Sequence, residues 1–370
     1  METSYKVKFR FVIGFIFTFF ILGLVIEYKF GIIKDIQNDR NEKIWYKPLP
    51  EFPSSFNNKA GLSSNKFLDL PLNEDEKLFW RESLRNRILN EINGELFPTK
   101  PTQYKILSSK KTVSLEEQEL LITSFDGQLI PARLFIPVSN GSSPGILFIP
   151  GHSGSQSGML QLSDEVDSYQ HAAARKLAES GFVTLTFELR GFGYLGMPDY
   201  PEHNLWAYNA LQKGESYKTL ILKDTAVLIA LLKEHSKVDS NRIGITGASY
   251  GGEVAVQYGA LDKNIKAISF HSYAGNIGVP DDLNNSSTTP HLCHILPGID
   301  SWMTQENWIW LLAPRNIQGI RGIEDKKDFM KNYEIYAMGW NDRSKIKMQI
   351  EDGGHEYFTN SSINFFKSNL

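Results

Sequence analysis

Short apolar segments alternate with segments of amphipathic helical period from residue 146 to the end of the chain. The apolar segments, which predict strands, are 146–149, 182–187, 242–246, 265–270, 317–320 and 346–350. The amphipathic segments, which predict helices, are 169–180, 216–235, 249–261, 326–338 and a last one from His355. Strands that alternate with helices in this way form a mostly parallel sheet whose two faces are both covered. The sequence therefore predicts an α/β fold with helices on both faces of a central sheet.

An antiparallel hairpin is expected to precede this alternation. Segments 119–125 and 129–136 are strand-like, and Pro137 closes the second. Asp126 and Gly127 between them favour a tight turn.

A further helix is expected over residues 73–92. Asn73 is a good N-cap, Glu76 stands three residues later, and Gly94 ends the segment. The apolar residues that we expect to pack on the main domain fall largely on one helical face: Leu78, Phe79, Ile88, Leu89 and Ile92.

The N-terminal segment differs in character from the rest of the chain. Lys6, Lys8 and Arg10 precede an uninterrupted apolar run over residues 11–26. That run is a little shorter than the ~20 residues of a spanning helix, but snorkelling by Arg10 and Lys29 lengthens it. Since the basic residues lie before the run, we expect a single-pass anchor with a cytoplasmic N-terminus and an extracytoplasmic remainder. The alternatives are a cleaved signal peptide on a secreted protein and a buried helix of a soluble one.

Three parts are therefore expected along the chain. Residues 1–30 form the hydrophobic anchor or signal segment. Residues 31–114 form a tether, rich in Asn, Lys, Ser and Pro at its start, together with the accessory helix. Residues 115–370 form the main domain.

Composition and charge exclude several classes of function. A formal net charge of −3 does not indicate a polyanionic partner such as nucleic acid, and none is expected. The single cysteine, Cys293, excludes an internal disulfide and any Cys-x-x-Cys motif. His291, Cys293 and His294 invite a metal interpretation, but three ligands within four residues are awkward for one tetrahedral ion. We therefore expect no metal and no other cofactor, and the oligomeric state is not indicated.

The run Gly247-Ala248-Ser249-Tyr250-Gly251 matches the Gly-x-Ser-x-Gly pattern of a nucleophilic serine. The pattern alone is weak, because glycine and serine are both common. Its position strengthens the prediction, since a strand precedes it and a helix follows, which places Ser249 on a sharp strand-to-helix turn. The alternative is an ordinary glycine-rich turn of an α/β sheet.

A serine hydroxyl is a poor nucleophile without a general base, and the base needs an acid that orients it. His355, preceded by two glycines, follows the last predicted strand and is the expected base. Asp325 follows the strand at 317–320 and is the expected acid, with Asp328 and Glu324 as alternatives.

Backbone N–H groups are expected to bind the oxyanion. Tyr250 begins the helix after Ser249, where free N–H groups and the helix dipole favour negative charge. His152 lies in the glycine-rich loop after the strand at 146–149 and is the expected second donor. An ordinary turn is the alternative for that loop.

Four further runs surround these residues, at 188–193, 238–244, 260–262 and 312–315. They read Glu-Leu-Arg-Gly-Phe-Gly, Val-Asp-Ser-Asn-Arg-Ile-Gly, Ala-Leu-Asp and Leu-Ala-Pro-Arg. Together with the serine motif they resemble the acetyl xylan esterase and dienelactone-hydrolase-related branch of the α/β-hydrolase superfamily. The resemblance implies the α/β-hydrolase fold and a carboxylic ester hydrolase without a cofactor. It also implies that acid and base stand at Asp325 and His355.

The expected function is serine-dependent hydrolysis of carboxylic esters through an acyl-enzyme, on acetylated sugars or other short acyl esters. A serine peptidase of the prolyl-oligopeptidase type is one alternative, although residues 31–114 are too few for the propeller that usually accompanies it. A non-enzymatic binding protein is another, disfavoured because Ser249, Asp325 and His355 are all present. A cytosolic dienelactone-type enzyme is disfavoured by the apolar N-terminal run.

Overall fold

The computed structural model describes residues 70–71, 73–92, 96–98, 101–139, 141–196, 203–274, 292–325 and 329–370. Residues 65–370 belong to one compact unit. The predicted membrane segment and the tether after it lie outside the described residues, and the three-part division of the chain stays a prediction. Within the described ranges, no helix is both long and apolar enough to cross a membrane.

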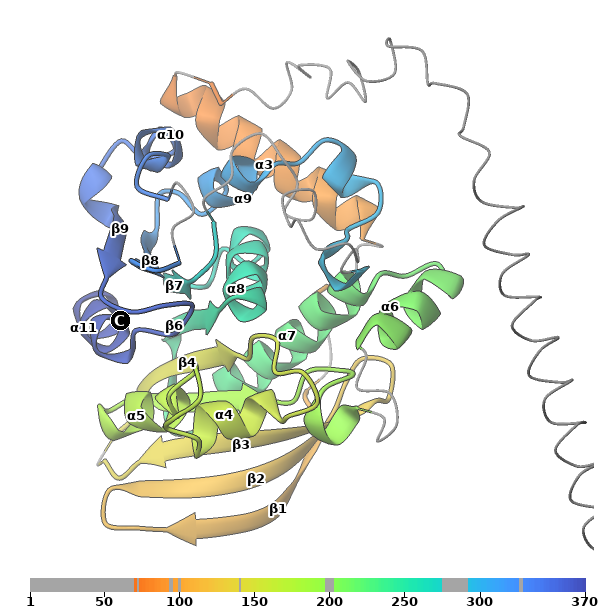
Figure 1. Cartoon of the computed structure of the whole chain (residues 1–370), viewed down its shortest axis with the longest axis vertical. Coiled ribbons are helices and arrows are strands. Elements are labelled where there is room, and N and C mark those ends of the chain that lie inside the picture. Colours follow the sequence, from red (N-terminus) through yellow and green to blue (C-terminus); the bar gives the residue numbers. More distant parts are fainter. Residues whose placement is uncertain are drawn as a thin grey trace, which may run out of the picture. The chain divides into compact units, whose positions relative to one another are not determined.

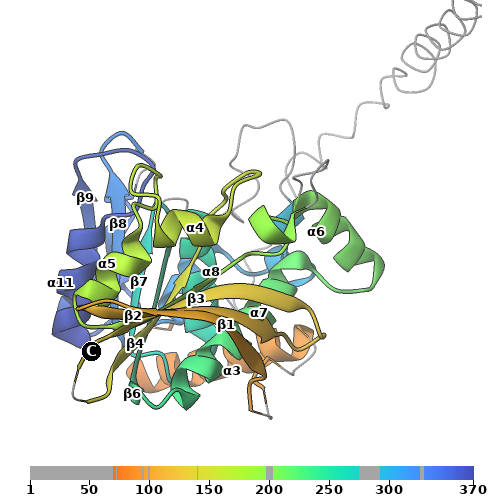
Figure 2. The ribbon, with the colours of Figure 1, turned by 90° about the horizontal axis from the view of Figure 1, so that it is seen from below.

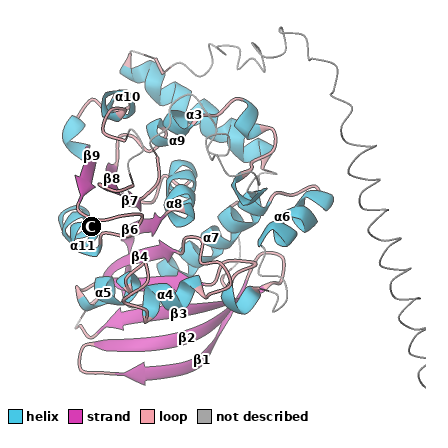
Figure 3. Cartoon of the chain, viewed as in Figure 1, coloured by secondary structure: helices cyan, strands magenta, loops and turns pink. Residues whose placement is uncertain are grey.

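The described residues form one nine-stranded sheet (Figures 1 and 3). Its strands are β1 (Tyr104–Lys111), β2 (Leu115–Thr123), β3 (Leu129–Pro137), β4 (Ser143–Ile149), β5 (Val183–Phe187), β6 (Val238–Ala248), β7 (Ala267–His271), β8 (Asn316–Gly322) and β9 (Ile346–Glu351). Their order in the sheet is β1-β2-β3-β5-β4-β6-β7-β8-β9. The pairs β1–β2, β2–β3 and β3–β5 are antiparallel, and every later pair is parallel. The predicted parallel sheet and the hairpin ahead of it are both confirmed.

Helices cover both faces of this sheet. They are α3 (Glu74–Glu91), α4 (Gly158–Ser163), α5 (Ala173–Glu179), α6 (His203–Gln212), α7 (Tyr217–Glu234), α8 (Tyr250–Leu261), α9 (Gln305–Trp310), α10 (Tyr333–Ala337) and α11 (Thr359–Asn369). Helices α5 and α11 contact each other on one face, whereas α7 and α8 contact each other and β4 on the opposite face (Figure 2).

Strand β4 shows why the sheet needs cover on both sides. Successive side chains of a strand point to opposite faces. Leu147 and Ile149 enter the core beneath α7 and α8, and Ile146 and Phe148 enter the core beneath α5 and α11. All four are fully buried, which stabilises the fold by about 1.5–3 kcal/mol for each side chain. The continuous apolar run that predicted this strand follows from burial on both faces.

Strand β1 was not predicted from the sequence. All of its residues are exposed, and it pairs only with β2 at the edge of the sheet. An edge strand with two solvated faces carries no apolar alternation, so its sequence Tyr-Lys-Ile-Leu-Ser-Ser-Lys-Lys gives no strand signal. Its lysines suit an edge that has to avoid further pairing.

Two predicted helices begin later than expected. Helix α5 starts at Ala173 rather than 169, because His171 and Ala172 have φ values of 56° and 51°, outside the right-handed helical region. Helix α11 starts at Thr359, four residues after the predicted His355. The helix predicted over 326–338 is represented by α10 at Tyr333–Ala337, and residues 326–328 lie outside the described ranges.

Helix α3 confirms the predicted helix at 73–92 but not its predicted buried face. The Asn73 side chain accepts a hydrogen bond from the Asp75 N–H at 2.9 Å, as an N-cap does. Ile88 and Ile92 are buried, whereas Leu78 and Phe79 are exposed. The prediction of the buried face was wrong in part, because arginines occupy part of that face.

Two arginines attach α3 to the rest of the unit. Arg85 donates from Nε to the Ala260 carbonyl at 2.7 Å and from Nη2 to the Leu311 carbonyl at 2.5 Å. Arg81 donates from Nη2 to the Gly339 carbonyl at 2.6 Å. A guanidinium can satisfy backbone carbonyls at helix ends and loops while its stem packs on apolar surface. Hydropathy alone therefore misjudges which face of α3 is inside.

Candidate active site

Ser249 lies on the sharp turn between β6 and α8. Its φ and ψ are 56° and −125°, a conformation that non-glycine residues rarely adopt and that costs of order 1–3 kcal/mol. The Ser249 N–H donates to the His271 carbonyl at 2.9 Å, and its own carbonyl accepts the Glu253 N–H at 3.1 Å. The strand-to-helix turn expected around Ser249 is present, and the surrounding hydrogen bonds hold its strained backbone.

Glycines on both sides of Ser249 let the loop after β4 approach this turn. A Cβ at Gly251 would lie 2.1 Å from the Ile149 carbonyl oxygen and 2.8 Å from that of Pro150. A Cβ at Gly247 would lie 2.4 Å from the Gly251 carbonyl carbon. These neighbours are backbone atoms, which cannot rotate away as a side chain can. Glycine at these positions is a requirement of the close approach.

Asp325 and His355 form a hydrogen-bonded pair. Their Oδ2 and Nδ1 atoms are 3.0 Å apart. Because an ionised carboxylate only accepts, the proton of this bond lies on Nδ1, which leaves Nε2 as the basic nitrogen. The loops that carry the pair are themselves joined, since the Glu324 N–H donates to the Gly353 carbonyl at 3.0 Å. The side chain of His355 is half exposed and that of Asp325 is 14% exposed.

Arg321 is a third member of this group, and its role was not predicted from the sequence. Its Nη1 lies 3.1 Å from Asp325 Oδ1, and its Nε donates to the Ala274 carbonyl at 2.8 Å. Burial alone would raise the pKa of Asp325, but the hydrogen bond from His355 and the charge of Arg321 outweigh it and hold that pKa below its usual value. The sequence signal that could have identified Arg321 was an arginine inside a strand that is otherwise buried on both faces.

The structure describes only one of the two alternative acids. The Glu324 side chain is exposed, and Asp328 lies outside the described residues. Of the two carboxylates that the structure describes, Asp325 is the one that it brings to His355.

All the predicted site residues follow the carboxyl ends of parallel strands. Ser249 follows β6, Asp325 follows β8 and His355 follows β9. His152 follows β4, which lies between β5 and β6 where the order of strands reverses. In open α/β sheets this edge, at the reversal of strand order, is where ligands bind.

Tyr169 connects the base loop to the loop of His152, and nothing in the sequence had singled it out. Its hydroxyl donates to the His152 carbonyl at 2.9 Å, and its ring centroid lies 6.2 Å from that of His355. Its own carbonyl accepts the Tyr357 N–H at 2.9 Å. These contacts fix the His152 loop relative to the segment that carries His355.

The two expected oxyanion donors belong to residues in contact. The His152 ring stacks on the Tyr250 ring, with centroids 4.8 Å apart and an interplanar angle of 21°. Tyr250 is the first residue of α8, where backbone N–H groups have no acceptor within the helix. The stacking brings the loop after β4 and the start of α8 together beside Ser249.

A buried ionic network lies behind Tyr250. Glu253 receives Lys218 Nζ on Oε1 and His294 Nδ1 on Oε2, both at 2.5 Å. Burial alone would raise the pKa of Glu253, but His294 and Lys218 outweigh it and lower that pKa to about 2. The Lys218 ammonium also lies 4.0 Å from the centroid of the Tyr250 ring. The network therefore anchors the first turn of α8, which contains Tyr250 and Glu253, to α7 through Lys218.

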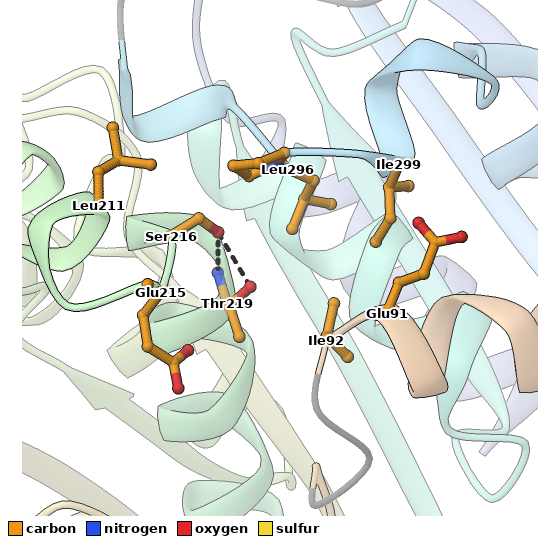
Figure 4. A pocket seen from close by; sticks show the side chains of 10 residues that line it. Glu91, Ile92, Leu211, Glu215, Ser216, Thr219, Leu296 and Ile299 are labelled. Atoms are coloured by element: carbon orange, nitrogen blue, oxygen red, sulfur yellow. Dashed lines mark hydrogen bonds between the residues drawn. The ribbon is translucent and has the colours of Figure 1, made fainter.

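A cavity of about 260 Å³ lies between the end of α3, the start of α7 and the segment around Leu296 (Figure 4). Glu91 and Glu215 line it, and each already has a partner: Trp302 Nε1 lies 3.3 Å from Glu91, and Lys223 Nζ lies 3.0 Å from Glu215. Among the described residues of its wall, none belongs to the predicted catalytic set.

Solved structures of esterases share this fold. A putative acetyl xylan esterase from Bacteroides fragilis aligns with a TM-score of 0.61 at 18% identity, over 77% of this chain and 76% of that one. The methylesterase BT1017 aligns with a TM-score of 0.58 at 16% identity, over 85% and 66%. A glucuronoyl esterase from Solibacter usitatus aligns with a TM-score of 0.57 at 14% identity, over 80% and 94%. At such identities the likeness concerns the fold, which is that of the α/β-hydrolases.

A curated relative matches at the level of sequence. It is an uncharacterised 31.7 kDa protein of the traX–finO intergenic region of Escherichia coli, 27% identical over 121 residues. The match spans 32% of this chain and 37% of the relative's length.

The profile of the acetyl xylan esterase (AXE1) family matches residues 69–273. The matched segment makes up more than half of the 370 residues and includes the turn at Ser249 and the loop of His152. The chain therefore belongs to the acetyl xylan esterase family of carboxylic ester hydrolases.

Proposed function

We propose that this hydrolase cleaves its ester through an acyl-enzyme on Ser249. The observation that carries the proposal is the hydrogen-bonded pair of Asp325 and His355, at the same sheet edge as the strained serine. A serine, an acid and a histidine in this chain order fit the arrangement of α/β-hydrolases. The carboxylate fixes the imidazole tautomer, so that the basic Nε2 is the nitrogen that remains for the serine.

The proposed reaction has two halves. In the first, His355 Nε2 takes the Ser249 hydroxyl proton as Oγ attacks the ester carbonyl carbon, and His355 then protonates the departing alcohol. In the second, His355 takes a proton from water, the hydroxyl attacks the acyl carbon, and Ser249 leaves with that proton as the acid is released. Backbone N–H groups of Tyr250 and His152 bind the negative oxygen of each tetrahedral intermediate.

The proposed substrates are short acyl esters of carbohydrate hydroxyls. The family description and the name of the Bacteroides fragilis relative, a putative acetyl xylan esterase, support this class, whereas two further relatives are named for methyl and glucuronoyl esters. A panel of acetylated xylo-oligosaccharides, methyl esters and glucuronoyl esters would rank the three ester types named for those proteins. We expect the acetyl esters to have the highest kcat/KM, and a clear preference for methyl or glucuronoyl esters would contradict this choice.

Fluorophosphonate labelling tests the nucleophile. We expect one label for each chain and hydrolysis of p-nitrophenyl acetate, with labelling abolished in Ser249→Ala and kcat lowered by at least about 10⁴-fold. Ser368→Ala, at an exposed position on α11, is the matched control and should keep both.

The same assay separates the alternatives. Cleavage of aminoacyl-proline amides in preference to esters would favour the peptidase. Equal labelling of wild type and Ser249→Ala would place the nucleophile elsewhere, and absence of both labelling and turnover would favour a binding protein.

Attachment to a membrane through residues 11–26, with the catalytic domain outside the cytoplasm, stays a proposal from the sequence alone. Fractionation of cells that express the full chain tests it. Recovery of the intact chain in the soluble cytosol would overturn it.

A further inference from the structure

Three side chains that can bind a metal converge behind the predicted oxyanion loop. His152 lies in the loop after β4, His203 is the first residue of α6, and Cys293 lies in the short helix η3 (Leu292–His294). Their ligand atoms all lie within 4.8 Å of one another. Cys293 Sγ is 3.3 Å from His152 Nε2, and the two imidazole centroids are 4.8 Å apart.

The surroundings of this cluster are aromatic and largely closed to solvent. Cys293 is fully buried, and the two histidines are half-buried. The Phe192 ring stacks on the His203 ring at 4.7 Å, and the Tyr250 ring stacks on the His152 ring at 4.8 Å. Rings on both sides restrict the orientation of the imidazoles, which is how proteins preorganise histidine ligands.

We propose that His152, His203 and Cys293 bind a zinc ion. Two imidazole nitrogens and one thiolate form the mixed N and S donor set that Zn²⁺ prefers, and three protein ligands leave one position open. Ligand atoms around tetrahedral zinc stand about 3.3–3.7 Å apart, given bond lengths of about 2.0–2.3 Å. The 3.3 Å between Cys293 and His152 already meets this spacing, and the ligand atom of His203, which lies within 4.8 Å of both, would have to approach by at most about 1.5 Å.

This set differs from the one that the sequence suggested. His291, Cys293 and His294 are too close along the chain to surround one ion, and His291 lies outside the described residues. His294 Nδ1 is engaged by the Glu253 carboxylate at 2.5 Å. Ligands from three separate segments have no such restriction, because each approaches the ion from a different direction.

The ion would act as a cross-link beside the active site. Binding replaces the proton of the Cys293 thiol, which is released to solvent, and joins the β4 loop, α6 and η3 through one centre. Because His152 is a ligand through its side chain, the ion would also fix the backbone that offers the second oxyanion donor. The site goes beyond the proposed esterase function and does not depend on it.

Cobalt substitution provides the sharpest test, since the chain has a single cysteine. A sulfur-to-cobalt charge-transfer band in the near ultraviolet can therefore arise only from Cys293. We expect the full chain, produced without a polyhistidine tag and stripped of metal, to give this band at one Co²⁺ per chain and to lose it on addition of Zn²⁺. Absence of the band at saturating Co²⁺ would overturn the proposal.

Zinc content measured by mass spectrometry provides the matched comparison. We expect about one zinc per wild-type chain, and at least a fivefold loss in Cys293→Ser and in His203→Gln. His235→Gln, a histidine at the end of α7 outside the cluster, should retain the metal. Ser249→Ala should also retain it, which separates failure of the zinc site from failure of the catalytic proposal. Full zinc content in Cys293→Ser would contradict the assignment.

Thermal unfolding gives a readout in which each protein is compared with itself, with and without added zinc. Because an ion that binds only the folded state stabilises it, Zn²⁺ should raise the Tm of the metal-free wild type by about 5 °C or more. The same addition should leave the Tm of Cys293→Ser unchanged. An equal rise in both proteins would mean that zinc binds elsewhere.

Discussion

Asp325 lies between Arg321 and His355, and its substitution tests the identity of the acid. Asn in its place keeps the shape but lets the His355 ring adopt the wrong tautomer, so we expect Asp325→Asn to lower kcat by about 10³–10⁴-fold. Glu324→Gln, next to it in the chain but exposed, should stay within about twofold of wild type. Steady-state kinetics on p-nitrophenyl acetate measures both, and the reverse result would make Glu324 the acid.

The depressed pKa of Asp325 also predicts how stability depends on pH. The pKa of this group is below its unfolded value of about 3.9, so its ionised form contributes stability that is present above that value. This contribution is lost as the pH falls through the folded pKa. Urea unfolding between pH 7 and pH 3 should therefore show a shallower loss of stability for Asp325→Asn than for wild type. Identical slopes would contradict the shift.

Substitution of Glu253 tests how much the protein is destabilised when one buried charge is removed and its cationic partners remain. Glu253→Gln leaves the Lys218 ammonium, which is fully buried, without its carboxylate, so we expect a loss of about 3–5 kcal/mol in the free energy of unfolding. Lys218→Met combined with Glu253→Gln removes the buried lysine charge as well, leaves only His294 without its carboxylate, and should regain part of that loss. Chemical denaturation of the wild type, the single variant and the double variant measures their free energies of unfolding. A double variant that is less stable than Glu253→Gln would contradict this explanation.

At the scale of single elements, the turn between β6 and α8 depends on a contact with β4. We expect Gly251→Ala to destabilise the protein by at least about 3 kcal/mol, because its Cβ would lie 2.1 Å from a backbone oxygen of Ile149. Gly141→Ala is the control, since its Cβ meets nothing within 4 Å, and should stay within about 0.5 kcal/mol. Equal stabilities would mean that the turn can move away from β4 at little cost.

The same scale explains which elements could be predicted. Strands β4, β5, β7 and β8 and the second half of β6 are buried on both faces, so local hydropathy marks them. Strand β1 is exposed and depends on pairing with β2, which no local pattern reports. The buried face of α3 was predicted wrongly in part, because Arg81 and Arg85 pair with carbonyls of distant segments.

At the scale of the whole molecule, the compact unit begins near Asn65, before the predicted main domain. A chain of residues 65–370 should keep its Tm within about 2 °C of the full chain. A chain of residues 115–370 lacks α3 and β1. The apolar surface against which Ile88 and Ile92 pack would then be exposed, so the Tm should fall by at least about 10 °C. Calorimetry compares the three. An unchanged Tm for residues 115–370 would make α3 an accessory helix, as the sequence division supposes.

The order of the strands from β2 onward and the choice of Ser249 and His355 as candidates follow from the sequence by itself. Apolar period, glycine placement and turn chemistry act over a few neighbouring residues, so they can be read without knowing the fold. They place Ser249 after one strand and His355 after another, and they leave Asp325, Glu324 and Asp328 as alternatives.

Only the tertiary structure decided which of these groups meet. It brings Asp325 to His355, adds Arg321 and Tyr169 around them, and gathers His152, His203 and Cys293 from three segments. These contacts depend on how loops pack at one edge of the sheet. The free energy that stabilises them comes from interactions between residues far apart in the chain. Local sequence therefore determines the chemistry that each side chain can supply, and long-range packing determines which side chains supply it together.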